Sequence, residues 1–248
     1  EICKVHQIVV IEDCAHTMGA KWNDTWSGRF GEFGCYSTQT YKHINSGEGG
    51  FLVTDDAEAM AKAIMLSGSY MLYERHSAGP PKHVFEDVKY LMPNISGRMD
   101  HLRAAILRPQ LKTLEAQSRA WNSRYREIAN GLNGTPGLHL INRPKKEYFV
   151  GSSIQFLLKE WSSEALTELI KRCSERGVEL KWFGAKQPIG FTSTYTSWKY
   201  AEHDPMPKSD KILAGLMDMR IPLTFSLEDC AKIASIIRSE VSGIWKAF

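Results

Sequence analysis

The chain has 248 residues, 43% hydrophobic and 24% charged, so it can bury a sizeable core in one large or two small domains. Its net charge of +3 comes from evenly mixed charges, which argues against a nucleic-acid or membrane surface. The five cysteines are an odd number without a CxxC pair, which argues against a disulfide framework or a zinc site. We expect a cytoplasmic protein that binds small molecules or protein partners, with no membrane span and no metal.

The first strand expected along the chain is QIVVI at residues 7–11, a largely apolar, β-branched run typical of a strand covered on both faces. It leads into Glu12 and Asp13, which places a carboxylate at the carboxyl end of the strand, where open α/β sheets bind ligands. Asp13 could instead cap a turn or helix that begins at Cys14. The local sequence leaves both interpretations of Asp13 open.

Two more strands flank a polar loop that contains a lysine. FGCYS at residues 33–37 and FLV at residues 51–53 are strand-like, and the segment 38–50 between them carries Lys42. The third strand stops at Asp55. We therefore expect three strand ends to converge on one edge of a mostly parallel sheet.

The GEGG turn at the end of this loop has a structural explanation. Gly47, Gly49 and Gly50 are expected to adopt positive φ in a tight turn, which glycine does without steric cost. We assign these glycines to backbone geometry rather than to catalysis.

Asp13, Ser37 and Lys42 are the residue types that a pyridoxal phosphate (PLP) site requires. PLP is held by a lysine as a Schiff base, and its phosphate needs hydroxyl and backbone donors. A carboxylate beside the ring nitrogen keeps that nitrogen protonated, so the ring can act as an electron sink. The lysine amine can then move a proton as general base and acid. Taken alone, Lys42 also fits a solvated surface lysine.

Three stretches of sequence resemble a known family. IEDCAHTMGA (11–20), GEFGCYS (31–37) and KHINSGEGG (42–50) together resemble the sugar and aminocyclitol aminotransferases of the DegT/StrS family, which are fold-type-I PLP enzymes. The segment 96–115 resembles that family's arginine-bearing entry into a long helix. MPKSDKILAGLMDMRIPL (206–223) resembles the close of its small domain. The resemblance covers nearly the whole chain.

The resemblance implies roles for four residues near the start of the chain. Lys42 would form the Schiff base with PLP, and Asp13 would pair with the pyridinium nitrogen. Ser37 would bind the phosphate. His16 stands where many relatives have Gln and would contact the ring face or the phenolic oxygen, although it could also be a plain helix-start histidine.

A further role is implied for Asn94 or Ser96. Relatives place an Asn two residues before the arginine, and that Asn reaches across a dimer interface to the partner's PLP phosphate. This chain has Ser96 before Arg98, with Asn94 displaced by two positions. Either residue could therefore reach the partner's phosphate.

The expected fold class is α/β, a fold-type-I PLP-dependent transferase with a partial large domain and a smaller α+β C-terminal domain. Residues 1–110 would form the remainder of the PLP-binding large domain, and residues 111–248 would form a bridging helix and the small domain. The bridging helix is expected over residues 99–132, with Pro109 as a possible kink. Its apolar residues at helical intervals, which we expect to face a core, are Leu102, Ala105, Ile106, Leu111, Leu114, Tyr125 and Ile128. Within the small domain we expect strands at 151–158 and 178–182 and helices at 162–176 and 227–241.

The chain departs from the family in two regions. Relatives carry a first half before the IED strand, with a phosphate loop and an aromatic residue that stacks on the pyridine ring. We expect a second polypeptide to supply that half, or else a truncated or proteolysed chain. The loop 182–200 begins Trp182, Phe183, Gly184 where relatives usually show an aromatic-Pro-Leu-His pattern, which leaves the amino acceptor in doubt.

The function expected is a PLP-dependent aminotransferase, or the lysine-bearing subunit of a split one. It would move an amino group from glutamate or glutamine to a keto-sugar, cyclitol or related polar ketone, in antibiotic or polysaccharide biosynthesis, as a dimer or a heteromer. A dehydratase variant is disfavoured because such relatives replace the lysine, which is present here as Lys42. The alternatives are a non-catalytic partner subunit that keeps the fold and a carbohydrate-binding module that uses the seven tryptophans, of which only Trp182 and Trp198 cluster in the sequence.

Overall fold

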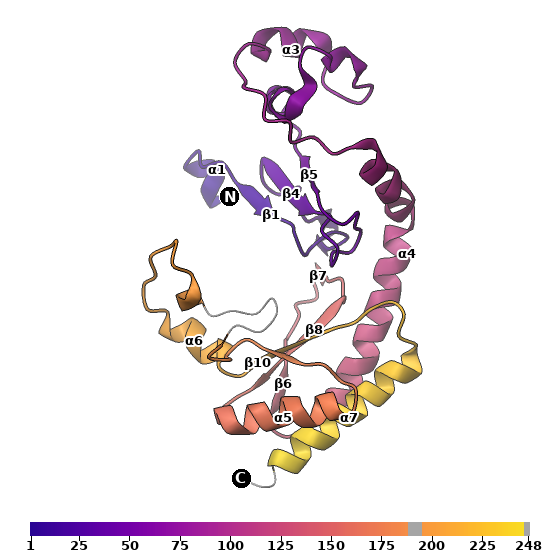
Figure 1. The fold of residues 1–248 in the computed structure, drawn as a ribbon, viewed down its shortest axis with the longest axis vertical. Coiled ribbons are helices and arrows are strands. Elements are labelled where there is room, and N and C mark those ends of the chain that lie inside the picture. Colours follow the sequence, from indigo (N-terminus) through magenta and orange to yellow (C-terminus); the bar gives the residue numbers. More distant parts are fainter. Residues whose placement is uncertain (188–194, 246–248) are drawn as a thin grey trace. The chain divides into compact units, whose positions relative to one another are not determined.

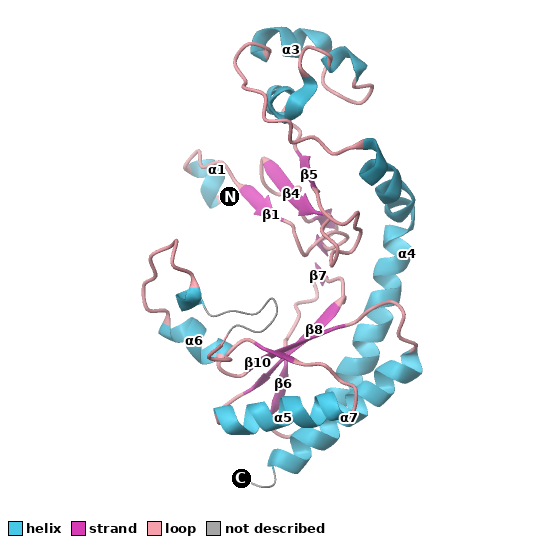
Figure 2. Cartoon of the chain, in the orientation of Figure 1, coloured by secondary structure: helices cyan, strands magenta, loops and turns pink. Residues whose placement is uncertain are grey.

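The structure is a computed structural model that describes residues 1–187 and 195–245. The chain divides into two compact units, and each is described by itself. Unit 1 comprises residues 1–116 and 145–150, and unit 2 comprises residues 117–144 and 151–248. Both units contain helices and strands, as Figures 1 and 2 show.

The main sheet of unit 1 has the strand order β1-β4-β5, with β1 at Ile11–Asp13, β4 at Phe33–Ser37 and β5 at Gly50–Val53. The strand expected at 7–11, covered on both faces, is wrong in extent and in burial, because only Ile11 belongs to β1 and Ile8, Val9 and Ile11 are 54%, 61% and 66% exposed. Among the described strands, β1 is an edge strand that pairs only with β4, so apolar residues in this run do not require a covered strand. β1 runs parallel to β4, with Asp13 opposite Cys35. The carboxyl ends of these two strands therefore meet at one edge, as predicted.

The third strand reverses this pattern. β5 runs antiparallel to β4, with Gly50 opposite Ser37 and Val53 opposite Gly34. The expectation that a third strand end, at Asp55, converges on the same edge is wrong. The reason is the intervening loop, which closes on itself so that Thr38 N donates to Gly49 O at 2.9 Å and the chain turns straight back.

The remainder of unit 1 consists of short elements. A three-stranded sheet has the order β3-β2-β7, from Thr25–Trp26, Lys21–Trp22 and Glu147–Tyr148. β7 thus brings residues 145–150, which the sequence assigned to the second domain, into unit 1. The helical elements before the long helix are α1 (Ile2–Val5), α2 (Ala57–Ile64), the π-helical turn η1 (Met65–Ser69), the 3-10 turn η2 (Tyr73–Arg75) and α3 (Lys82–Val88).

The long helix α4 spans His101–Leu132 and contains Pro109, which confirms the predicted helix. Its buried side is not the one predicted for the first half. Leu102 is 72% exposed and Ile106 is 44% exposed, whereas Leu107 is 1% exposed. The buried or half-buried stripe follows a helical period through Leu107, Gln110, Leu114, Ser118, Trp121, Tyr125, Ile128 and Leu132. Two residues of this stripe, Gln110 and Ser118, are polar. A prediction based on hydrophobic residues alone therefore chose a neighbouring face of the helix.

Unit 2 is an antiparallel sheet with helices beside it. The strand order is β6-β8-β10-β9, from Leu138–Leu140, Ser153–Leu158, Leu216–Arg220 and Lys181–Trp182. Along β8 every second side chain is buried, and these side chains pack in one core with α5 (Ser163–Glu175) and α7 (Leu227–Trp245). Figure 1 shows the two helices beside the strands of this sheet. The connection from β9 to β10 includes the 3-10 turn η3 (Tyr195–Ser197) and α6 (Pro207–Leu213).

The predicted elements of unit 2 are mostly confirmed. The Ser162 side chain accepts a hydrogen bond from Ala165 N at 3.2 Å, so it caps α5 as its position suggested. The strand expected at 178–182 is shorter, because only Lys181–Trp182 pairs with β10. Part of the aromatic loop 182–200 lies outside the described residues.

Candidate functional site

Lys42 lies in a loop that is closed by its own backbone hydrogen bonds. Besides the bond between Thr38 and Gly49, Ser46 N donates to Thr38 O at 3.0 Å and Thr40 N donates to Gly47 O at 2.8 Å. The φ angles of Gly47 and Gly49 are +91° and +131°. These values confirm the predicted turn at both positions, and other residues would be strained there.

Gly50 is different. It lies in β5 and is not among the residues with positive φ, so that expectation is wrong. A Cβ atom at this position would lie 2.6 Å from Tyr36 O. Glycine is needed here because two backbone segments approach closely.

The lysine loop is also attached to α4. Asn45 N donates to Gln110 Oε1 at 3.0 Å, and Gln110 Nε2 donates to Asn45 O at 2.8 Å. One residue earlier, Ile44 is fully buried in a cluster with Met18 and Leu107. The backbone that carries Lys42 is therefore held by a two-bond amide contact and by a packed side chain.

The Lys42 side chain meets the turn that follows β1. Its Nζ atom lies 2.8 Å from Nε2 of His16, which is three residues beyond Asp13. Asp13 is exposed, and its Oδ1 atom accepts a hydrogen bond from Ala15 N at 3.0 Å. This bond matches the turn-capping interpretation of Asp13 and leaves the carboxylate with further acceptor capacity.

Ser37 is the last residue of β4, at the same edge as Asp13. Its Oγ atom accepts a hydrogen bond from Gln39 N at 3.3 Å. The parallel pairing of β1 and β4, together with the contact between Lys42 and His16, thus brings four of the predicted site residues to one edge of the sheet. A carboxylate, an imidazole, a hydroxyl and an amine are available there.

Glu12 is a contributor that the sequence analysis did not single out. Its carboxylate accepts hydrogen bonds from the backbone N–H groups of Gly28, Phe30 and Gly31, at 2.8, 2.6 and 2.8 Å. Because side chains alternate along a strand, Glu12 and Asp13 leave β1 on opposite faces. Glu12 thereby ties a glycine-rich loop to the strand that presents Asp13. The sequence feature that could have indicated this role is the pair Glu12 and Asp13 at a strand end, followed by the glycine-containing loop.

Tyr36 packs on the face opposite Ser37. Its hydroxyl group donates to Ser27 O, and burial raises the pKa of Tyr36 to about 12. The phenol therefore stays neutral at physiological pH and acts as a hydrogen-bond donor within the structure.

Asn94 and Ser96 belong to a second cluster, around Tyr70. Ser96 N donates to Asn94 Oδ1 at 3.0 Å, and the hydroxyl oxygens of Tyr70 and Ser96 lie 3.3 Å apart. Hydrogen bonds from Ser96 and Asn94 lower the pKa of Tyr70. Arg98 lies over the Tyr70 ring, 5.8 Å from its centroid, and donates to Gly68 O. Both candidate residues join this cluster, so the structure does not choose between them.

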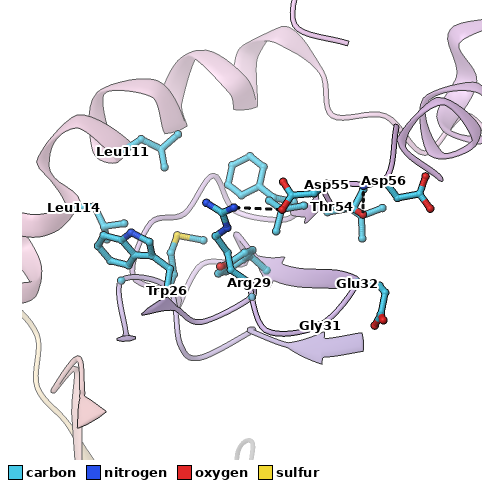
Figure 3. Close-up of a pocket in the computed structure, with 16 residues that line it drawn as sticks. Trp26, Arg29, Gly31, Glu32, Thr54, Asp55, Asp56, Leu111 and Leu114 are labelled. Carbon is cyan, nitrogen blue, oxygen red and sulfur yellow. Dashed lines mark hydrogen bonds and ion pairs between the residues drawn. The ribbon is translucent and has the colours of Figure 1, made fainter. Parts of the chain in front are cut away.

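A cavity of about 780 Å³ lies elsewhere in unit 1 (Figure 3). Figure 3 shows Trp26, Leu111 and Leu114 on one side of it and an ion pair between Arg29 and Asp55, 3.3 Å apart, on the other. None of Asp13, His16, Ser37 and Lys42 is among its lining residues. Tyr36 lines it and Ser37 does not, as strand alternation requires. This cavity is therefore separate from the group of site residues.

Two further properties concern ligands and membranes. In the described part of the chain, no three or more His, Cys, Asp or Glu side chains are grouped so as to hold a metal ion. Within residues 1–187 and 195–245, no helix has the length and apolar character needed to span a bilayer.

Comparisons with known proteins give one family. The DegT/DnrJ/EryC1/StrS aminotransferase family model matches residues 1–238. A putative L-glutamine:3-amino-2,3-dideoxy-scyllo-inosose aminotransferase from Micromonospora echinospora is 46% identical over 67 residues, which are 27% of this chain and 16% of that protein. The equivalent putative enzyme of Streptoalloteichus tenebrarius is 24% identical over 200 residues, 79% of this chain and 46% of its own length.

A solved structure with the same fold is a putative sugar aminotransferase, Spr1654 from Streptococcus pneumoniae, in its PLP form. It superposes with a TM-score of 0.77 at 16% identity and covers 98% of this chain and 60% of its own. The likeness confirms the predicted fold class. The chain spans about half the length, or less, of the curated relatives it matches.

Proposed function

The chain belongs to the DegT/DnrJ/EryC1/StrS aminotransferase family, and we propose that it acts in PLP-dependent amino-group transfer with Lys42 as the cofactor-bearing lysine. The observation that carries this proposal is the position of the Lys42 amine, 2.8 Å from His16 Nε2 and on the strand edge that also holds Asp13 and Ser37. A solved relative of the same fold is described in a PLP form, which supports the choice of cofactor.

The residues at this edge fit PLP by their donor and acceptor types. When bound, PLP supplies an electron sink that stabilises negative charge on a substrate carbon. Asp13 would provide a carboxylate for the protonated ring nitrogen, since an opposite charge within about 4–6 Å favours the protonated state. Ser37 accepts from Gln39 N, so its own hydroxyl hydrogen can be donated to a phosphate oxygen.

Lys42 has two tasks in this proposal. Its amine would hold the cofactor covalently, and when not so bound it would act as general base and acid for a proton at the substrate carbon. Both tasks need an amine whose backbone does not drift. The amide contact from Gln110 and the buried Ile44 side chain supply that restraint.

The proposed substrates are an amino donor, glutamate or glutamine, and a polar ketone such as a keto-sugar or a cyclitol ketone. The names of the two relatives, which include L-glutamine and an amino-dideoxy-inosose, support this class. The departure from the family pattern at 182–184 leaves the choice of acceptor open. Trp182 is buried and its indole N–H donates to Ala214 O at 2.8 Å, so it serves the core of unit 2.

The proposal includes family-type dimerisation, in which Asn94 or Ser96 approaches the cofactor phosphate of a partner copy. A second polypeptide that supplies an N-terminal half receives no support from the comparisons, and we leave it out of the proposal. The biosynthetic pathway and the cytoplasmic location stay predictions.

Two alternative functions are not enzymatic. A carbohydrate-binding module built on Trp182 and Trp198 is weakened because Trp182 is buried while Trp198 is 48% exposed, so the two do not form one open aromatic face. A non-catalytic partner subunit keeps the fold and would have no need of cofactor.

The deciding experiment is an absorbance spectrum in the near-ultraviolet and visible range, with added PLP, before and after borohydride. Mass spectrometry of the peptide that contains Lys42 then locates any reduced pyridoxyl group. We expect a borohydride-sensitive band and a pyridoxyl group on Lys42, followed by amino transfer from glutamate or glutamine to a keto-sugar or inosose. A well-folded chain that shows no band with excess PLP would contradict the proposal and favour the non-catalytic subunit.

A further inference from the structure

The contact between Lys42 and His16 joins two separately restrained parts of unit 1. On one side, the turn after β1 is tied down by the hydrogen bond from Ala15 N to Asp13 and by Cys14 N, which donates to Cys35 O at 2.8 Å. On the other side, the lysine loop is attached to α4. The 2.8 Å separation of Nζ and Nε2 is therefore a contact between two anchored backbones.

The chemistry of the two groups defines what this contact does. A lysine ammonium has three N–H donors and no acceptor, and in the neutral tautomer that carries its proton on Nδ1 the His16 Nε2 atom accepts one of those bonds. When Lys42 is an ammonium that donates to Nε2, its nitrogen has no lone pair with which to attack an electrophile, and it must lose a proton before it can react. The contact thus holds the amine in place and keeps it unreactive at the same time.

We propose that His16 is a positioning residue that holds the Lys42 amine through Nε2 whenever this amine has no covalent partner. The contact of His16 with the amine in the cofactor-free chain is argued from geometry alone. A role of this contact in the capture and release of PLP rests on the proposed function. Removal of His16 should then have two opposite effects. The Lys42 amine should react faster with a small reagent that can approach from any direction. It should react more slowly with PLP, because PLP binds in one orientation and the amine must already point at its aldehyde.

The first test is competitive acetylation of the cofactor-free chain with a trace of acetic anhydride. The reagent forms an amide at Nζ and releases acetate and a proton, and mass spectrometry compares Lys42 with Lys171. Lys171, on α5, has a side chain that is 65% exposed and serves as the internal reference. In His16→Leu we expect the ratio of Lys42 to Lys171 labelling to rise by about fivefold, as for the loss of a partly exposed hydrogen bond to a charged group. In His16→Gln, whose amide oxygen still accepts, the ratio should return to within about twofold of wild type.

The second test measures the rate at which PLP is captured, as pyridoxyl groups left on Lys42 after borohydride at successive times. Here we expect His16→Leu to be about tenfold slower than wild type, with His16→Gln restoring most of the rate. A residue with only a structural role would lower both rates together and would not be rescued by Gln. Circular dichroism would check that both variants are folded. We expect them to fold because His16 is exposed.

The outcomes separate this inference from the proposed function. An unchanged ratio of Lys42 to Lys171 acetylation in His16→Leu would overturn the inference, regardless of the rate of PLP capture. Faster labelling together with undiminished PLP capture would overturn the positioning role. If His16→Leu raises the labelling ratio but the wild-type chain captures no PLP, the holding of the amine stands and the proposed function fails.

Discussion

In unit 2, β8 buries every second side chain against α5 and α7, so that Ile154 and Phe156 are fully buried. In unit 1, by contrast, Ile11 of β1 is 66% exposed and Leu52 of β5 is 40% exposed, and the buried clusters are small. Unit 2 therefore derives its stability mainly from packed apolar area, and the site in unit 1 is held mainly by hydrogen bonds between loops, strands and α4.

This difference separates the chemistry from most of the apolar core. The four residues proposed to act on PLP lie in unit 1, on short strands and loops. Substitutions in the two units should accordingly have different consequences, with loss of function at one edge of unit 1 and loss of stability in the centre of unit 2.

Lys42→Ala should have the largest effect on function. We expect complete loss of covalent PLP capture, because no amine remains at the position, with an unchanged free energy of unfolding. The measurement is borohydride trapping together with urea denaturation. Lys171→Ala is the matched control, since it removes an exposed lysine from unit 2 and should leave capture intact. A pyridoxyl group trapped on another lysine at the wild-type rate would show that the site is wrongly placed.

Asp13→Asn should bind PLP but turn over more slowly, by about 10- to 1000-fold, the factor that corresponds to a shift of 1–3 pKa units from an adjacent opposite charge. The side chain keeps an oxygen that can accept from Ala15 N, so the turn should persist. Single-turnover amino transfer, measured by the cofactor spectrum, gives the rate. Wild-type turnover in Asp13→Asn would remove Asp13 from the role we propose.

Phe156→Ala should destabilise the chain by about 3–5 kcal/mol, because it opens a cavity in a fully buried position of unit 2. Leu52→Ala is the comparison in unit 1, where a 40% exposed side chain should cost about 1 kcal/mol or less. Urea denaturation followed by circular dichroism measures both. Equal losses of free energy would contradict the contrast drawn between the two sheets.

Gln110→Leu should cost about 1–3 kcal/mol locally, since it removes both hydrogen bonds to the Asn45 backbone. We expect faster amide hydrogen exchange at Asn45 and slower PLP capture by Lys42. Lys112→Ala changes an exposed position of the same helix and should leave both quantities unchanged. If the Asn45 amide in Gln110→Leu exchanged hydrogen as slowly as in the wild type, the loop would be held by other contacts.

Sequence alone was sufficient where a local pattern has one physical outcome. The apolar run at 33–37 predicted β4 with Ser37 at its end, and the helix expected at 162–176 is found as α5. The strand expected at 7–11 is displaced and lies at Ile11–Asp13. Gly47 and Gly49 indicated their positive φ angles, because few other residues adopt them. The helix through Pro109 followed from its period.

The tertiary structure decided what no local pattern contains. The antiparallel direction of β5 depends on how the lysine loop closes, and the buried side of α4 depends on polar residues such as Gln110, whose partner Asn45 lies 65 positions away. The hydrogen bonds of Glu12 and the contact of Lys42 with His16 also join separate segments. Residue type and period are properties of neighbours along the chain, and they predicted most of the elements and nominated the candidate site residues. Distances between side chains arise only when separate segments pack, and they determined which of those residues meet.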